Sequence, residues 1–92
     1  MINLNSVPYR SEGVIGRVVD GEAVLVLPEI GKVKVLNEVG GLIWSNVDGE
    51  KTVRQISELL AEEYEVGIPE AEEDVQTFLS DLEERSVVFF KI

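Results

Sequence analysis

The spacing of the apolar residues changes once along this chain, at Asn37. Before it, Val33-Lys34-Val35-Leu36 alternates between polar and apolar residues, as a half-buried strand does. After it, Val39, Leu42 and Ile43 recur at helical spacing. Asn37 is a good helix N-cap, because its side-chain oxygen can accept a hydrogen bond from a free backbone N–H. The chain is therefore expected to place its strands first and its helices second.

Three strands are predicted before this junction. Asp20-Gly21 separates two apolar runs, residues 14–19 and 22–27. Asp-Gly is a strong hairpin signal, because a type I′ turn needs positive φ at both central residues. Pro28 ends the second run, and residues 32–36 form the third. Together they predict an antiparallel meander, whose first and third strands are edges.

Three helices are predicted after the junction. The first ends before Asp48-Gly49, and the second begins with a capping box formed by Thr52 and Gln55. Its buried stripe includes Leu59. The third begins near Pro69, which is tolerated in a first helical turn. The predicted fold class is α+β: a three-stranded antiparallel meander followed by three helices, winged-helix-like, with a short C-terminal extension.

The composition removes most catalytic chemistry. With no cysteine and no histidine, thiolate nucleophiles, disulfides and the commonest general base and metal ligand are all absent. Nothing places two of the 18 acidic residues in a defined cleft. Glu72-Glu73-Asp74 is a poor metal site, since consecutive helical residues point about 100° apart. We expect no enzyme activity, no cofactor and no metal.

The charge distribution argues against nucleic-acid and membrane partners. The net charge is −10, and residues 45–92 hold thirteen of the acids but only four of the bases. Nucleic-acid and anionic membrane surfaces would repel such a chain. No apolar run approaches the roughly 20 residues that span a bilayer, and the N-terminus lacks the features of a signal peptide. A cytoplasmic location is expected.

An ordered set of motifs runs through the chain: Asp20-Gly21, Gly31-x-Val33-x-Val35-Leu36-Asn37, residues 40–44, Asp48-Gly49-Glu50-x-Thr52, Ile56, Leu59-Leu60, Asp74-Val75, Phe78-Leu79, Leu82 and Val87-Val88. This set resembles the PqqD-like family of peptide-recognition elements from ribosomal peptide biosynthesis. The likeness covers about residues 13–88, and residues 1–92 are interpreted as a single PqqD-like domain. Residues 1–12 would be an irregular N-terminal arm, and residues 86–92 a C-terminal strand or tail. Gly40-Gly41, Ser86 and Phe89-Phe90 depart from the usual pattern.

The resemblance implies a non-catalytic function. Such domains bind the leader of a precursor peptide as an added strand along the third strand, in a cleft bounded by the third helix. They deliver it in trans to a modifying or leader-cleaving enzyme. A radical S-adenosylmethionine (SAM) enzyme would indicate pyrroloquinoline quinone (PQQ) biosynthesis, and a leader peptidase would indicate lasso peptide biosynthesis. The sequence does not distinguish these pathways. The predicted peptide-binding residues are Lys32, Val33, Lys34, Val35, Leu36, Asp74, Val75, Phe78, Leu79, Asp81, Leu82 and Arg85.

Edge-strand physics supports the same surface. An edge presents unpaired N–H and C=O groups, which an incoming peptide can satisfy. Lys32 and Lys34 could instead guard the edge against aggregation. A stripe such as Val75, Leu79 and Leu82 is usually core, so Phe78 is the better candidate for lining a groove. Asp74, Asp81 and Arg85 flank Phe78, and acids at a cleft would favour a basic residue in the ligand. A solvated helix face is the alternative interpretation.

Other functions and occupants stay open. The order of elements also allows a winged-helix-like nucleic-acid-binding or regulatory domain. The apolar segment at residues 87–90 could cross to another chain, giving a homodimer by strand exchange. The predicted edge therefore has three candidate occupants: a leader peptide, a second copy of the chain, or the chain's own tail.

Overall fold

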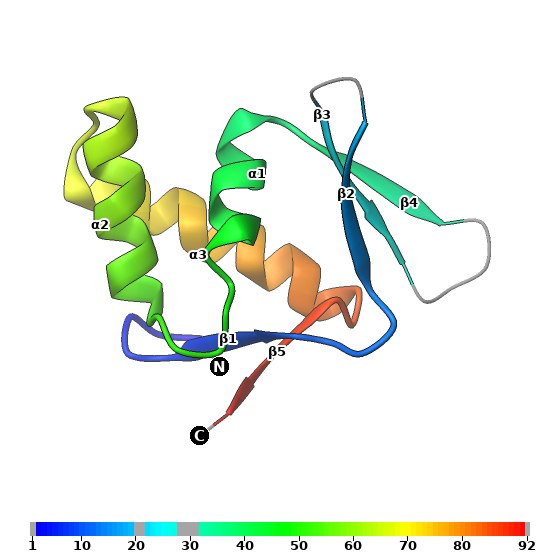
Figure 1. The fold of residues 1–92 in the computed structure, drawn as a ribbon. Helices are drawn as coiled ribbons and strands as arrows, with labels where there is room; N and C mark the ends of the chain where they lie inside the picture. Colours follow the sequence, from blue (N-terminus) through cyan, green and yellow to red (C-terminus); the bar gives the residue numbers. More distant parts are fainter. Residues whose placement is uncertain (1, 20–21, 28–31, 92) are drawn as a thin grey trace.

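The computed structural model describes residues 2–19, 22–27 and 32–91. The predicted Asp20-Gly21 turn and the Pro28–Gly31 connector lie outside the described residues. Four strands, three helices and a last strand follow one another along the chain (Figure 1). They are β1 (Val7–Arg10), β2 (Ile15–Val19), β3 (Glu22–Val26), β4 (Val33–Leu36), α1 (Glu38–Ser45), α2 (Val53–Tyr64), α3 (Ile68–Glu84) and β5 (Val88–Lys91).

The strands β2, β3 and β4 form an antiparallel sheet with β3 in the centre. Ala23 of β3 pairs with Leu36 of β4, and Val26 pairs with Val33. β2 pairs antiparallel with β3, and Val19 lies opposite Glu22. The α+β fold with a three-stranded sheet, three helices and a short C-terminal strand is confirmed.

The helices begin where their caps predict. The Asn37 side chain accepts a hydrogen bond from Gly40 N over 2.8 Å. The capping box of α2 is complete: Gln55 N donates to Thr52 Oγ1 over 3.1 Å, and Thr52 N donates to Gln55 Oε1 over 2.9 Å. The prediction that Leu59 is buried is wrong, because its side chain is 39% exposed.

The N-terminal arm is not irregular as predicted, because it contains β1. This strand pairs antiparallel with β5, and Tyr9 lies opposite Phe89. Their rings stack with centroids 5.3 Å apart. Ahead of β1, Ser6 O accepts a hydrogen bond from Val53 N over 2.9 Å, which ties the arm to the start of α2. The β1–β5 ribbon crosses one end of the molecule, away from β4, so the chain's own tail does not occupy the β4 edge (Figure 1).

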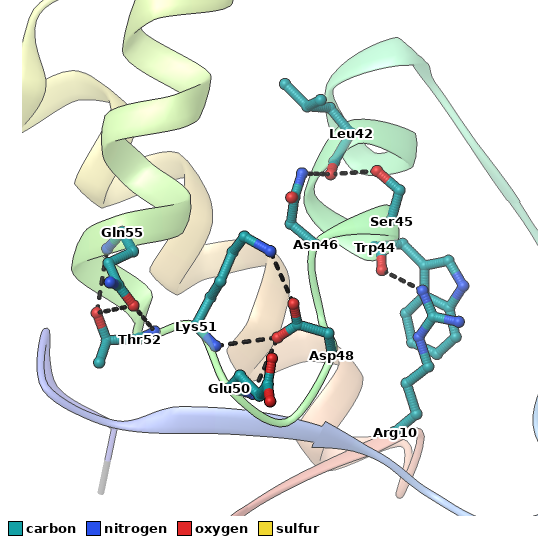
Figure 2. Close-up of polar contacts among 10 residues, drawn as sticks. All are labelled: Arg10, Leu42, Trp44, Ser45, Asn46, Asp48, Glu50, Lys51, Thr52 and Gln55. Carbon is teal, nitrogen blue, oxygen red and sulfur yellow. Dashed lines mark hydrogen bonds and ion pairs between the residues drawn. The ribbon is translucent and has the colours of Figure 1, made fainter.

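Polar contacts hold the loop between α1 and α2 near this ribbon (Figure 2). The Asp48 carboxylate accepts hydrogen bonds from Glu50 N and Lys51 N, each over 2.9 Å, and pairs with Lys51 Nζ at 2.7 Å. The Lys51 ammonium and these backbone N–H groups hold the pKa of Asp48 well below its usual range. Arg10 of β1 donates to Trp44 O over 2.6 Å, and its guanidinium lies 4.4 Å from the Trp44 ring centroid. The contacts of Arg10 with Trp44 therefore join the β1–β5 ribbon to α1, directly before the loop.

The hydrophobic core joins the inner face of the sheet to all three helices and β5. Its side chains interlock across elements that are distant in sequence, so sheet and helices form one packed unit. The buried members are Leu25, Leu36, Ile43, Trp44, Val47, Val53, Ile56, Leu60, Ala61, Ala71, Val75, Leu79, Leu82, Val87 and Val88. Within the described residues, no helix combines the length and apolar character that crossing a bilayer requires.

Candidate functional site

A hydrogen bond just before β4 shows which backbone groups of this strand point toward β3. Leu27 N donates to Lys32 O over 3.0 Å, so these residues are a hydrogen-bonded pair of the antiparallel ladder. In such a ladder, bonded and non-bonded pairs alternate. Counting along the register, Lys34 and Leu36 also direct their backbone groups toward β3.

The residues between them have the opposite orientation. Val33 and Val35 direct their N–H and C=O groups away from β3, toward the open side of β4. No other strand in the described part of the chain pairs with this side. β4 therefore presents two donors and two acceptors in the geometry that an added strand requires.

The side chains of β4 divide between two faces. Val33 and Val35 are 61% and 57% exposed, whereas Leu36 is buried and Lys34 lies on the same face as Leu36. Of the two lysines beside these valines, Lys32 is exposed and Lys34 is half-buried. The reason is that Lys34 finds a partner on α3. Two exposed valines consequently accompany the free backbone groups.

An ion-pair network spans the space between β4 and α3. Lys34 Nζ lies 3.3 Å from Asp81 Oδ2, and Arg85 Nε lies 3.2 Å from the same oxygen. Partial burial acts to raise the pKa of Asp81, but the hydrogen bonds from Lys34 and Arg85 outweigh it, so its pKa lies below the ordinary value. One carboxylate thus holds two cations at the boundary between the strand and the helix.

A groove of about 700 Å³ lies between the start of α1 and the middle of α3. Phe78 and Val39 are half-buried and form an apolar part of its lining. Gly40 explains how the helices approach so closely, since a Cβ on Gly40 would lie 2.9 Å from Phe78 Cε1. Glu73 and Asp74 are the exposed acids of the lining. The groove therefore combines half-buried apolar surface with two exposed carboxylates.

The predicted site residues fall into three groups. Val75, Leu79 and Leu82 are fully buried in the core, so they support α3 and present no surface to a ligand. Phe78, Asp74 and Asp81 line the groove, and Arg85 reaches it through Asp81. The β4 residues and the adjacent Lys32 form the edge.

Sequence reasoning missed the contribution of α1 to the groove. Asn37, Val39 and Gly40 line it, as do Thr77 and Glu73 of α3. The Gly40-Gly41 pair was the available signal, since a glycine inside a helix often marks a close approach. Its partner Phe78 is distant in sequence, so the pairing could not be inferred from the chain alone.

Known proteins share this architecture. The family model for coenzyme PQQ synthesis protein D (PqqD) matches residues 22–88. The structure of TbiB1 in complex with the TbiA(beta) leader peptide is 30% identical, with a TM-score of 0.78, and the match covers 87% of this chain and 93% of that one. No curated protein matches the chain.

Two further solved structures have similar folds. The PqqD truncation of Methylobacterium extorquens PqqCD, described as a stand-alone recognition element, is 26% identical, with a TM-score of 0.82. That match covers 97% of this chain and 95% of the other. A lasso peptide synthetase B1 complexed with its leader peptide is 22% identical, with a TM-score of 0.81, covering 90% and 98%. Since the family model spans well over half of the chain, this protein belongs to the PqqD family.

Proposed function

We propose that this protein is a non-catalytic module that captures the leader of a ribosomally made precursor peptide. The leader adds as a strand along β4 and is delivered to a modifying or leader-cleaving enzyme, with residues 1–92 acting as one peptide-recognition domain. The observation that carries the proposal is the open edge of β4, where the backbone groups of Val33 and Val35 face outward. The TbiB1 complex, a 30% identical structure holding a leader peptide, supports it.

The two elements of the site have different tasks. Backbone pairing along β4 supplies affinity for an extended peptide of almost any sequence, while pockets for alternate side chains supply selectivity. The adjoining groove, with Phe78 at its floor, is suited to the second task. Lys34 and Asp81 connect the two, since they bridge β4 and α3.

The partner enzyme would act in trans and would be either a radical SAM enzyme or a leader peptidase. The identity of the neighbouring genes would distinguish these partners, and a short reading frame among them would supply the leader to be tested. Both the chain and that leader can be produced separately, and binding measured before any enzyme is added.

Val35→Pro tests the proposal, because proline removes an N–H that points to the open side of β4. The β3–β4 hydrogen bonds use Lys34 and Leu36 instead, so the sheet keeps its ladder. Fluorescence anisotropy with the labelled leader should show binding weakened about tenfold or more, because a buried acceptor on the leader is left unpaired. Glu70→Ala, on the exposed start of α3, is the control and should bind like wild type.

The outcomes separate the candidate occupants of the edge. Equal binding of the leader by wild type and Val35→Pro, with the far-UV circular dichroism of both unchanged, would rule out strand addition at β4. Sedimentation velocity without peptide tests the homodimer. A dimer that Val35→Pro dissociates would mean that a second copy, and not a leader, uses this edge.

A further inference from the structure

We propose that the leader recognised by this protein carries a lysine or arginine on the N-terminal side of the segment that pairs with β4. That basic side chain would lie in the groove between α1 and α3. The inference rests on the proposed function and specifies the chemistry of the ligand.

The groove continues the β4 edge. β4 ends at Leu36, and the next residue, Asn37, already lines the groove. Asp81 also lines it and lies 3.3 Å from Lys34 of β4. A peptide that runs along β4 past Leu36 would therefore meet the groove at Asn37.

The lining fits a long side chain with a cationic end. Such a side chain lays its aliphatic stem on apolar surface and keeps its charge toward water. Phe78 and Val39 offer the apolar surface, and an aromatic face also attracts a cation directly. Glu73 and Asp74 stand at the exposed rim to receive the charge.

The charges of the site make an acidic ligand residue unfavourable there. The nearby cations, Lys34 and Arg85, both pair with Asp81. Among the residues that the structure describes, Glu73 and Asp74 make no ion pair. A glutamate or aspartate placed in the groove would meet these two carboxylates, whereas a lysine or arginine would neutralise one of them.

Strand direction sets the position of the basic residue. The sheet is antiparallel throughout, so a strand that continues the pattern runs opposite to β4. Its N-terminal end then lies beside Leu36, next to the groove. The basic residue is accordingly placed before the paired segment, not after it.

The test uses a display library of random 15-residue peptides and the full chain. Peptides that bind wild type are counter-selected against Val35→Pro, which leaves those that depend on the β4 edge. These should be enriched in lysine or arginine at one position on the N-terminal side of their apolar segment. Replacing that residue by glutamine should weaken binding to wild type about fivefold, the upper range for an exposed ion pair.

Two double variants test whether the preference for a basic peptide residue comes from the carboxylates of the groove. Glu73→Gln with Asp74→Gln should remove the difference between the lysine and glutamine peptides. Glu62→Gln with Glu63→Gln, on the exposed surface of α2, makes the same change in net charge and should leave the difference intact. Edge-dependent peptides without a basic preference, or a preference that the α2 control also removes, would overturn this inference and leave the proposed function standing. A library that yields no edge-dependent peptide would overturn both.

Discussion

The strands β4 and β5 are each four residues long, with three apolar residues and one lysine, yet their exposure differs. In β5, Val88 is 2% exposed, whereas Val33 and Val35 of β4 are 61% and 57% exposed. Each strand pairs with one neighbour, β5 with β1 and β4 with β3, and no second strand pairs with either of them in the part of the chain that the structure describes. β5 therefore places its first residue in the core, whereas β4 exposes two valines whose backbone groups face away from β3.

Side-chain contacts around the β1–β5 ribbon account for the difference. Tyr9 stacks on Phe89, and Lys91 Nζ lies 4.6 Å from the Tyr9 ring centroid. Val88 faces the core between these contacts and α3. At β4, Lys34 forms an ion pair with Asp81 of α3. Both strands contribute a core side chain, Val88 in β5 and Leu36 in β4, and β5 adds an aromatic stack with β1.

The same substitution in both strands should produce the largest contrast. Val88→Asp places an unpaired carboxylate in the core, so we expect it to lower the free energy of unfolding by about 3 kcal/mol or more. Val35→Asp, at an exposed position, should change it by no more than about 0.5 kcal/mol. Urea denaturation followed by the fluorescence of Trp44 measures both. Similar losses in the two variants would contradict the distinction drawn between these strands.

Substitutions at two glycines, one beside the β1–β5 ribbon and one beside the sheet, should have the next largest effects on the free energy of unfolding. Gly49 has a φ of +78°, and a Cβ there would lie 2.9 Å from the Tyr9 ring. Gly49→Ala should therefore destabilise the protein by about 1–2 kcal/mol, through backbone strain and displacement of Tyr9.

Gly41→Ala is the matched control, because its Cβ would lie at an ordinary 3.5 Å from Ala23 Cβ. Alanine in this helix should raise the free energy of unfolding by up to about 1 kcal/mol. Opposite signs in urea denaturation are expected. If Gly49→Ala were neutral, the loop would not be held against the ribbon as the structure indicates.

Helix caps and the spacing of apolar residues predicted most of the helices and strands. The features that were missed depend on contacts between residues far apart in the sequence. The Asn37 cap and the Thr52–Gln55 capping box depend on residues only three positions apart. Both could therefore be predicted from the local sequence. The strand β1 was not predicted because its partner β5 lies at the other end of the chain. In addition, Pro8 is a residue that usually argues against a strand.

The site was predictable in outline for the same reason. The edge follows from strand order, but the inward direction of Lys34 depends on Asp81, which only the packing of α3 brings near. Gly40 and Phe78 likewise become one surface through packing. Sequence indicated the elements of the site, whereas their relative placement required the tertiary structure.

The smallest expected effect concerns this ion pair and depends on pH. Because the pKa of Asp81 is lowered in the folded protein, its ionised form contributes stability above the ordinary aspartate pKa, and that contribution is lost as pH falls. Solvent screens this partly exposed group, so Asp81→Asn should lower the free energy of unfolding at pH 7 by less than about 1 kcal/mol. The difference from wild type should shrink below about pH 4, where the wild-type carboxyl also becomes protonated.

Thermal or urea denaturation between pH 3 and pH 7 measures this, with Asp74→Asn as the control. Asp74 lines the same groove but makes no ion pair among the described residues, so its replacement should give no comparable pH-dependent loss. A loss in Asp81→Asn that stayed constant across this pH range would assign the role of Asp81 to packing. In that case the Lys34–Asp81 ion pair would not contribute to holding β4 against α3.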